Sequence, residues 1–226
     1  MTKLKPFKAI IFDCDGVLID SEIIACEVEA AELTAAGWPC TAETIIQRFL
    51  GRSLSSMFSE IEDEMGKKFS QDFFMNLEEK TLLALKARLK PVRNIIEVVG
   101  SLLGQGHYRL AVASSSTRAR LQHNLGLTNL WNFFDGHIYS AEEVKNAKPA
   151  PDLFLAAAAG LGIAPQDCIV IEDSSNGIKA ATAAQMQAIG FVGGLHCLPA
   201  HRTILEDAGA LLVLEDMKDL LLKCNS

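Results

Sequence analysis

Five short apolar runs in this chain lack the alternation of apolar and polar residues that marks a half-buried strand. They occupy residues 9–12, 110–113, 169–171, 188–191 and 211–213. Such runs are typical of strands buried on both faces of a parallel sheet. Helical patterns separate the later runs, at residues 117–125, 152–160 and 178–186. This order of strands and helices predicts an α/β fold, a doubly wound, Rossmann-like parallel sheet.

The interval from 22 to 88 has helical periodicity and no strand pattern. Ser53 and Ser70 are suitable N-caps for two of its helices, and Pro91 stops the last one. A helical insert therefore interrupts the predicted sheet between its first and second strands. The sequence predicts two domains, an α/β core formed by residues 1–19 and 92–226 and a helical cap formed by residues 20–91.

The net charge and the length of the apolar runs argue against nucleic-acid and membrane partners. It has 21 basic and 28 acidic residues and a net charge of −7 at pH 7. An acidic chain repels phosphate backbones, so we expect no nucleic-acid partner. The longest nearly uncharged apolar run, Leu153 to Ala164, has 12 residues, whereas a membrane span needs about 20. We therefore expect no membrane partner.

The first residues and the cysteines favour a cytoplasmic location. Asp13 cuts short the apolar stretch near the start, so we expect no export signal. The six cysteines form no CxxC pair and have no histidine at zinc-finger spacing, which is typical of reduced thiols. For the oligomeric state we expect a monomer or a small homo-oligomer.

Polar residues follow several of the predicted strands. The first run leads into Asp13-Cys14-Asp15-Gly16, the second into Ser114-Ser115-Ser116, and the run at 169–171 into Glu172-Asp173. Lys148 lies in the connection before that last run. In open parallel sheets, ligands bind beyond the carboxyl ends of the strands, near the point where the strand order reverses. We therefore expect these side chains to meet at one edge of the sheet.

Acidic residues dominate this predicted site. The four acids are Asp13, Asp15, Glu172 and Asp173. Carboxylates at close range repel one another unless a cation or a proton lies between them, so the set indicates a hard divalent cation, most naturally Mg²⁺. Ser114 and Lys148 add a hydroxyl and a positive charge, which suit a phosphate group. Together these groups fit phosphoryl transfer to an aspartate carboxylate.

The motifs resemble those of a known enzyme family. Residues 12–21, with the sequence FDCDGVLIDS, look like the first motif of the haloacid dehalogenase superfamily of phosphohydrolases. Ser114 resembles its second motif, Lys148 in KPAPD its third, and Glu172-Asp173 with Asn176-Gly177 its fourth. The segment 148–177 is most similar to the β-phosphoglucomutase-like branch. That branch includes sugar-phosphate phosphatases and carries a helical cap after the first motif.

This resemblance implies a role for each of the four acids. Asp13 would be the nucleophile and a metal ligand. Asp15 would be the general acid and base, with its main-chain carbonyl also on Mg²⁺. Asp173 would bind the metal, with Glu172 assisting directly or through water. The implied activity is that of a Mg²⁺-dependent phosphatase that hydrolyses small phosphomonoesters, of sugars or sugar acids, through an aspartyl phosphate.

The same resemblance implies which residues bind the phosphate. Ser114 would hydrogen-bond the phosphoryl group, and Lys148 would hold nucleophile and phosphate together. Ser116, nearby, is expected to cap the following helix instead. Arg52 follows Gly51 at a break between cap helices, where it could contact an anionic substrate. The predicted phosphate- and substrate-binding set is Cys14, Asp15, Ser114, Ser115, Lys148 and Arg52.

Two other sequence features near these motifs have structural interpretations. Alternation along an extended segment points the Cys14 side chain away from the acids and into packing. His196 and His201 lie on either side of Cys197, but their spacing fits no standard metal pattern. Pro199 breaks any helix between these two histidines, which favours a loop.

Several other functions share part of the pattern. A phosphate-accepting receiver domain has no cap, and a dehalogenase of the same superfamily dispenses with the metal and the second acid, here Asp15. A sugar phosphomutase of the same branch is a closer alternative. Such mutases carry a His a few residues beyond the first motif, where this chain has Ala25. That difference favours hydrolysis; a non-catalytic phosphate-binding protein is a further alternative.

Overall fold

The computed structural model describes residues 4–49, 53–134 and 136–224. Its chain divides into two compact units. The larger unit comprises Met1–Asp20 together with Lys90–Ser226, and the smaller unit comprises Ser21–Leu89. The smaller unit is therefore one continuous insert, which begins shortly after the first strand of the larger unit.

The larger unit is built on a parallel sheet that has six strands within the described residues. In spatial order these are β3 (Ile138–Ser140), β2 (Arg109–Ser114), β1 (Ala9–Phe12), β4 (Cys168–Glu172), β5 (Gln187–Phe191) and β6 (Leu212–Leu214). The strand order reverses between β1 and β4, so the predicted doubly wound α/β fold is confirmed. The edge strand β3 is an addition to the five strands predicted from apolar runs.

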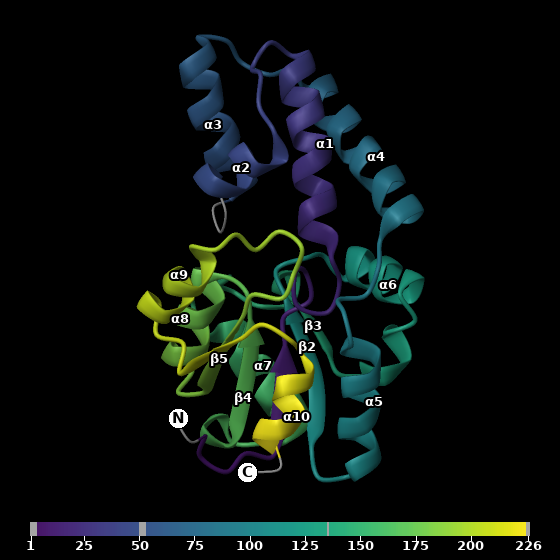
Figure 1. Ribbon diagram of the computed structural model, residues 1–226, viewed down its shortest axis with the longest axis vertical. Helices are drawn as coiled ribbons and strands as arrows, with labels where there is room; N and C mark the ends of the chain where they lie inside the picture. The colour runs from purple at the N-terminus through teal and green to yellow at the C-terminus, as the bar shows by residue number, and fades with distance from the viewer. Residues whose placement is uncertain (1–3, 50–52, 135, 225–226) are drawn as a thin grey trace. The chain divides into compact units, whose positions relative to one another are not determined.

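Burial of the central strands explains why their sequences do not alternate. All four residues of β1 are fully buried, and Ile11 pairs with Ala111 of β2 and with Val170 of β4. Helices α7 (Asp152–Leu161) and α8 (Ser175–Ala183) pack on one face, where Phe154 and Ile178 join the same apolar cluster. Since helices also cover the opposite face, strand side chains on both faces are apolar (Figure 1).

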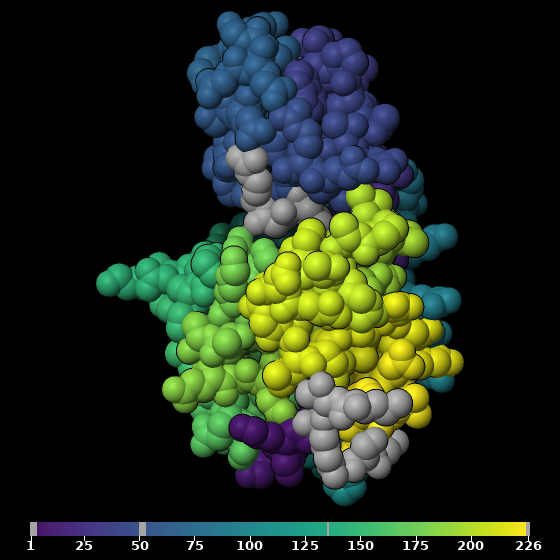
Figure 2. Space-filling model, turned by 60° about the vertical axis from the view of Figure 1, so that its left-hand side comes forward, coloured from purple at the N-terminus to yellow at the C-terminus, as the bar shows by residue number. Residues whose placement is uncertain are grey.

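The described part of the larger unit contains four further α-helices and three short 3-10 helices, which lie at Trp131–Phe134, Ala141–Glu143 and Pro165–Asp167. α5 packs against α10, and α9 packs against β5 and β6. Their bounds are α5 (Ile95–Gln105), α6 (Arg118–Leu127), α9 (His201–Asp207) and α10 (Lys218–Cys224). Figure 2 shows the face of this unit that is formed by the last part of the chain, from green through to yellow. None of the described helices is both long and apolar enough to cross a bilayer.

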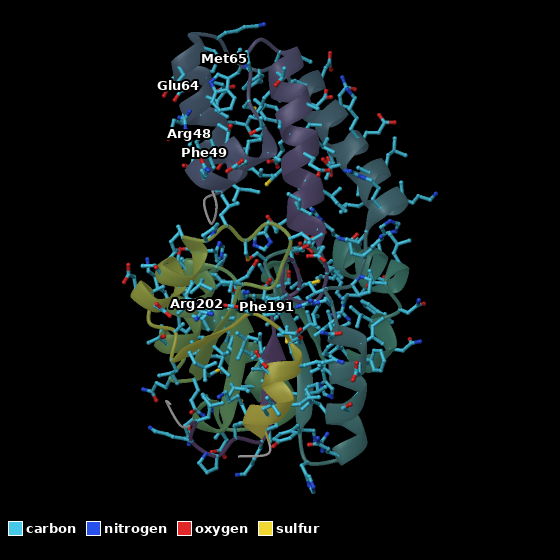
Figure 3. The ribbon with its side chains drawn as sticks, in the orientation of Figure 1. Arg48, Phe49, Glu64, Met65, Phe191 and Arg202 are labelled. Atoms are coloured by element: carbon cyan, nitrogen blue, oxygen red, sulfur yellow. The ribbon has the colours of Figure 1, made fainter. Side chains whose placement is uncertain are left out.

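The smaller unit consists of four helices in its described part. These are α1 (Ser21–Ala35), α2 (Ala42–Phe49), α3 (Leu54–Met65) and α4 (Gln71–Arg88). Ser53 and Ser70 cap α3 and α4 as predicted, because each hydroxyl accepts a hydrogen bond from a main-chain N–H three residues on. Arg48 of α2 contacts Glu64 and lies 2.9 Å from Glu60 of α3, which joins these two helices (Figure 3).

Candidate active site

The loop after β1 carries Asp13 and Asp15 to the carboxyl edge of the sheet. It turns at Gly16, whose φ of +80° is a conformation that favours glycine. A Cβ at Gly16 would lie 1.9 Å from Oδ2 of Asp173, so this position has no room for a side chain. Gly16 therefore allows the first acidic loop to pass directly against the acid that follows β4.

Lys148 joins the two acidic segments. Its Nζ lies 2.5 Å from Oδ1 of Asp13 and 2.8 Å from Oε1 of Glu172, and it also donates to the carbonyl of Ala113 at 2.9 Å. The Lys148 side chain is 5% exposed, so water screens these contacts weakly. The same Nζ lies 4.7 Å from the centroid of the Phe154 ring. Lys148 thus has a fixed position between the ends of β1, β2 and β4.

Two serine hydroxyls at the carboxyl end of β2 contact Asp15. Ser116 Oγ donates to Oδ2 of Asp15 at 2.7 Å, and Ser114 Oγ lies 3.4 Å from the same oxygen. Ser114 is buried and accepts the N–H of Ser116 at 3.1 Å, whereas Ser115 is exposed. The predicted capping role of Ser116 is wrong, because Thr117 caps α6 through the N–H of Arg120. Ser116 is instead a site residue that the sequence analysis missed.

Glu172 is held on both of its carboxylate oxygens. Oε1 faces Lys148, and Oε2 accepts the N–H of Ser174 at 2.7 Å and its hydroxyl at 2.9 Å. A Cβ at Gly177 would lie 1.7 Å from Glu172 Oε1, so the N-terminal turn of α8 must pass close to this carboxylate. These contacts favour a role for Glu172 in positioning Lys148 over direct binding of a metal.

Asp173 has two histidine partners that the sequence analysis assigned to a loop. Nε2 of His196 lies 2.9 Å from Oδ2 of Asp173, and Nε2 of His201 contacts its main-chain carbonyl. Both rings are at least 98% buried. The segment that carries His196 follows β5, whose carboxyl end lies at the same edge of the sheet. The sequence could have indicated these partners, because the segment with His196 follows the predicted strand at 188–191 and so begins at the edge where the acids lie.

Burial governs the electrostatics of this cluster. It raises the pKa of both Asp13 and Asp173 well above the ordinary range, and the neighbouring carboxylates add to the effect. Lys148 opposes the shift of Asp13, and the carboxylates of Asp13 and Glu172 in turn raise the pKa of Lys148 despite its own burial. Burial also lowers the pKa of His201, which favours its neutral ring.

The donor set at this edge fits Mg²⁺. Asp13, Asp15 and Asp173 offer carboxylate oxygens, and Lys148 supplies the single ammonium group among the contacts described here. A hard divalent cation bound through oxygens would stabilise the ionised forms that burial disfavours. Asp13 and Asp173 are the two acids whose pKa values such a charge would lower most directly, because burial raises both.

Cys14, one residue of the predicted phosphate-binding set, does not present its side chain to a bound phosphate. The Cys14 side chain is fully buried, as alternation predicted, so this position can offer only its main chain. Burial raises the pKa of this thiol, which argues against a reactive thiolate. Arg52 lies outside the described residues.

Comparison with protein families identifies the motifs. A family model described as haloacid dehalogenase-like hydrolase matches residues 10–191, which include all four motifs. Among solved structures, a haloacid dehalogenase-like protein of unknown function from Agrobacterium tumefaciens is 38% identical, with a TM-score of 0.88 and 96% of each chain covered. The similarity therefore extends over both units of the chain.

Curated relatives include several phosphatases and a mutase. The 6-phosphogluconate phosphatase of Escherichia coli is 28% identical over 85% of this chain and 86% of its own length. The beta-phosphoglucomutase of Bacillus subtilis is 31% identical over 96% of this chain and 92% of its own length. Protein SUPPRESSOR OF QUENCHING 1 of Arabidopsis thaliana, a chloroplastic protein, is 32% identical over 94% of this chain. This chain spans only about 20% of the length of that plant relative.

Proposed function

The chain belongs to the haloacid dehalogenase-like hydrolases, as its motifs predicted, and from this we propose that it is a Mg²⁺-dependent phosphatase. Its substrates are small phosphomonoesters of sugars or sugar acids, and the reaction passes through an aspartyl phosphate. The observation that carries the proposal is the position of Lys148 between Asp13 and Glu172, with Asp15 and its serine partners beside them.

Asp13 is the proposed nucleophile. One of its carboxylate oxygens attacks phosphorus while the bond to the leaving oxygen breaks, which leaves the phosphoryl group on Asp13. Lys148 faces the attacking carboxylate at 2.5 Å and neutralises charge that develops on the transferring oxygens. The hydroxyl of Ser114 is the second proposed donor to those oxygens. Glu172 holds Lys148 in place from the other side.

Asp15 is the proposed general acid and base. It protonates the leaving oxygen in the first step and takes a proton from the attacking water in the second. The 2.7 Å hydrogen bond from Ser116 fixes the orientation of its carboxylate. A metal at this site would be held by Asp13, by Asp173 and by the main-chain carbonyl of Asp15, and would supply positive charge to the phosphate oxygens.

The substrate class is proposed from relatives and from the insert. A relative named for 6-phosphogluconate supports a sugar-acid phosphate, and the four helices of 21–89 supply the cap that the family resemblance implies. We assign this unit as the cap domain, and Arg52, in its 50–52 segment, stays a predicted contact for an anionic substrate.

A panel assay tests the proposed function. Phosphate release would be measured with p-nitrophenyl phosphate, 6-phosphogluconate, hexose phosphates and hexitol phosphates, each with Mg²⁺. We expect turnover of p-nitrophenyl phosphate and a preference among the sugar compounds. A protein that binds these compounds but releases phosphate from none of them would be a phosphate-binding protein, contrary to the proposal.

Removal of divalent cations is expected to stop hydrolysis. Without a bound cation the buried carboxylates of Asp13 and Asp173 are disfavoured in their ionised forms, and the phosphate loses a source of positive charge. The loss should be at least about 10³-fold, which corresponds to several kcal/mol of transition-state stabilisation. The measurement is p-nitrophenol release in excess EDTA, followed by recovery with added Mg²⁺. Undiminished turnover in EDTA would contradict the metal requirement.

Mutase activity is the second candidate, because one curated relative is named a beta-phosphoglucomutase. Ala25 of α1 stands where such mutases carry a His, and the first histidine of the chain is His107. We therefore expect β-glucose 1-phosphate to yield inorganic phosphate and no glucose 6-phosphate. A coupled glucose 6-phosphate dehydrogenase assay, run beside a phosphate-release assay on the same samples, separates the two products. NADPH formation would establish the mutase instead.

A further inference from the structure

Two histidines and a cysteine gather after β5, beside the acidic cluster. One nitrogen from each of His196 and His201 and the sulfur of Cys197 lie within 4.8 Å of one another. Nε2 of His196 lies 3.5 Å from the Cys197 sulfur, and the centroids of the two imidazole rings are 5.6 Å apart. The segment closes on itself through hydrogen bonds from Cys197 N to Gly194 O and from His201 N to Leu198 O. These turns bring the three side chains together although their spacing along the sequence matches no standard metal-binding motif.

The tautomer of His201 is the one that a metal ligand requires. Its Nε2 contacts the main-chain carbonyl of Asp173, and a carbonyl only accepts, so Nε2 carries the proton. Nδ1 then has a lone pair, and it is a buried atom with no hydrogen-bond partner among the described residues. Metal-binding histidines generally donate their other N–H to a carbonyl or carboxylate in this way.

His196 occupies a tightly shaped position. A Cβ at Gly16 would lie 2.6 Å from the His196 ring, and a Cβ at Gly194 would lie 2.9 Å from it. Its Nε2 lies between Oδ2 of Asp173, at 2.9 Å, and the sulfur of Cys197. Asp173 therefore stands within reach as a fourth ligand. Cys197 is partly exposed, which gives an ion a path from solvent.

The two neighbouring donor sets differ in the metal that each prefers. The acidic cluster offers oxygen atoms, which suit Mg²⁺. Imidazole and thiolate ligands prefer Zn²⁺ and other late first-row transition-metal ions. Mg²⁺ does not displace these ions from such ligands. Tetrahedral Zn²⁺ holds its ligand atoms about 3.3–3.8 Å apart. The 3.5 Å between Nε2 of His196 and the Cys197 sulfur already meets this, and the wider separations, which are within 4.8 Å, must close by about 1 Å.

We propose that His196, Cys197 and His201 form a second cation site, selective for Zn²⁺ and similar transition-metal ions over Mg²⁺. Occupation of this site also acts on the first one. When the ion binds, the thiol of Cys197 and Nε2 of His196 each release a proton to solvent, and the carboxylate of Asp173, which loses its contact with that N–H, is drawn toward the new ion. The predicted consequence is inhibition of the Mg²⁺-dependent reaction by Zn²⁺.

Cobalt spectroscopy on the full chain tests the site without any assay of activity. The protein is freed of metal by dialysis against a chelator, saturated with Mg²⁺ and titrated with Co²⁺. We expect a thiolate-to-cobalt charge-transfer band in the near ultraviolet, together with the intense visible bands of tetrahedral Co²⁺. Cys197→Ser should abolish the charge-transfer band. Cys40→Ser is the matched control, because Cys40 is another partly exposed thiol and lies in the smaller unit.

The outcomes divide clearly. A band in the wild type and in Cys40→Ser that is lost in Cys197→Ser establishes the site. Absence of the band from the wild type overturns the proposal, and so does an equal band in Cys197→Ser, which would move the metal to another thiol such as Cys14.

Inhibition is measured separately, with p-nitrophenyl phosphate at saturating Mg²⁺. Cys197 has no assigned role in the Mg²⁺-dependent reaction, so Cys197→Ser should retain Mg²⁺-dependent turnover. It should need at least about tenfold more Zn²⁺ than the wild type for half inhibition, because the loss of a group that merely supports a metal ligand already costs about 10–100-fold in affinity. Equal sensitivity of both proteins would place the inhibitory ion at the acidic cluster and overturn the coupling.

Discussion

Replacing Asp13 with Asn is expected to abolish phosphate release. The amide is nearly isosteric with the carboxylate but cannot attack phosphorus, and loss of the nucleophile in a hydrolase costs on the order of 10⁶ in rate. Lys148 keeps its contact with Glu172 at 2.8 Å, so the ammonium is not left unpaired and the fold should survive. The measurement is phosphate release together with a search for a covalent phosphoenzyme by intact mass.

Asp20→Asn is the matched control for this experiment. Asp20 is also a buried acid near the end of the first motif, but its Oδ1 accepts the N–H of Leu195. An amide oxygen accepts the same hydrogen bond, so turnover of Asp20→Asn should remain within about tenfold of the wild type, since a neutral acceptor costs little there. Full activity in Asp13→Asn would show that another group is the nucleophile.

Replacing Asp15 with Asn is expected to separate the two chemical steps. Loss of a general acid or base typically costs about 10²–10⁴-fold per step. p-Nitrophenolate leaves without a proton, so with p-nitrophenyl phosphate the first step should suffer less than the second. The aspartyl phosphate on Asp13 should then accumulate, which intact mass spectrometry would detect as the addition of one phosphoryl group.

The double variant, with Asn at both positions, controls for adventitious labelling and should carry no phosphoryl group. Peptide mapping of the Asp15→Asn protein should place the label at residue 13. A label found on Asp15 in the wild type would reverse the assigned roles. Ser116→Ala should slow the same steps less than Asp15→Asn does. It removes the 2.7 Å hydrogen bond to Asp15 but leaves the Asp15 carboxylate in place.

The parts of the fold that were predicted are those encoded by local sequence. Continuous apolar runs identified β1 and its neighbours because these strands are buried on both faces. Ser53 and Ser70 identified two helix starts because N-capping is a contact between residues three apart. β3 has only three residues, one of them the half-buried Tyr139, so it leaves no comparable signal.

The parts of the site that were missed depend on contacts between distant segments. Ser116 lies 101 residues from its acceptor Asp15, and nothing near it in the sequence distinguishes a helix cap from this hydrogen bond. His196 lies 23 residues beyond Asp173, after a further helix and strand. The double contacts of Glu172 are likewise visible only once α8 is placed. Residue type identified the acids, whereas tertiary packing determined their partners.

The reversal of strand order between β1 and β4 has a consequence for synthesis of the protein on the ribosome. Asp13 emerges early, but its partner Lys148 lies 135 residues further along the chain. β1 cannot complete its pairing until β4 has been made, since Ile11 pairs with Val170 on that side. Contacts of such long range form late in folding. A nascent chain that ends before β4 therefore contains Asp13 and Asp15 but has no catalytic centre, which delays any phosphatase activity until β4 has been synthesised.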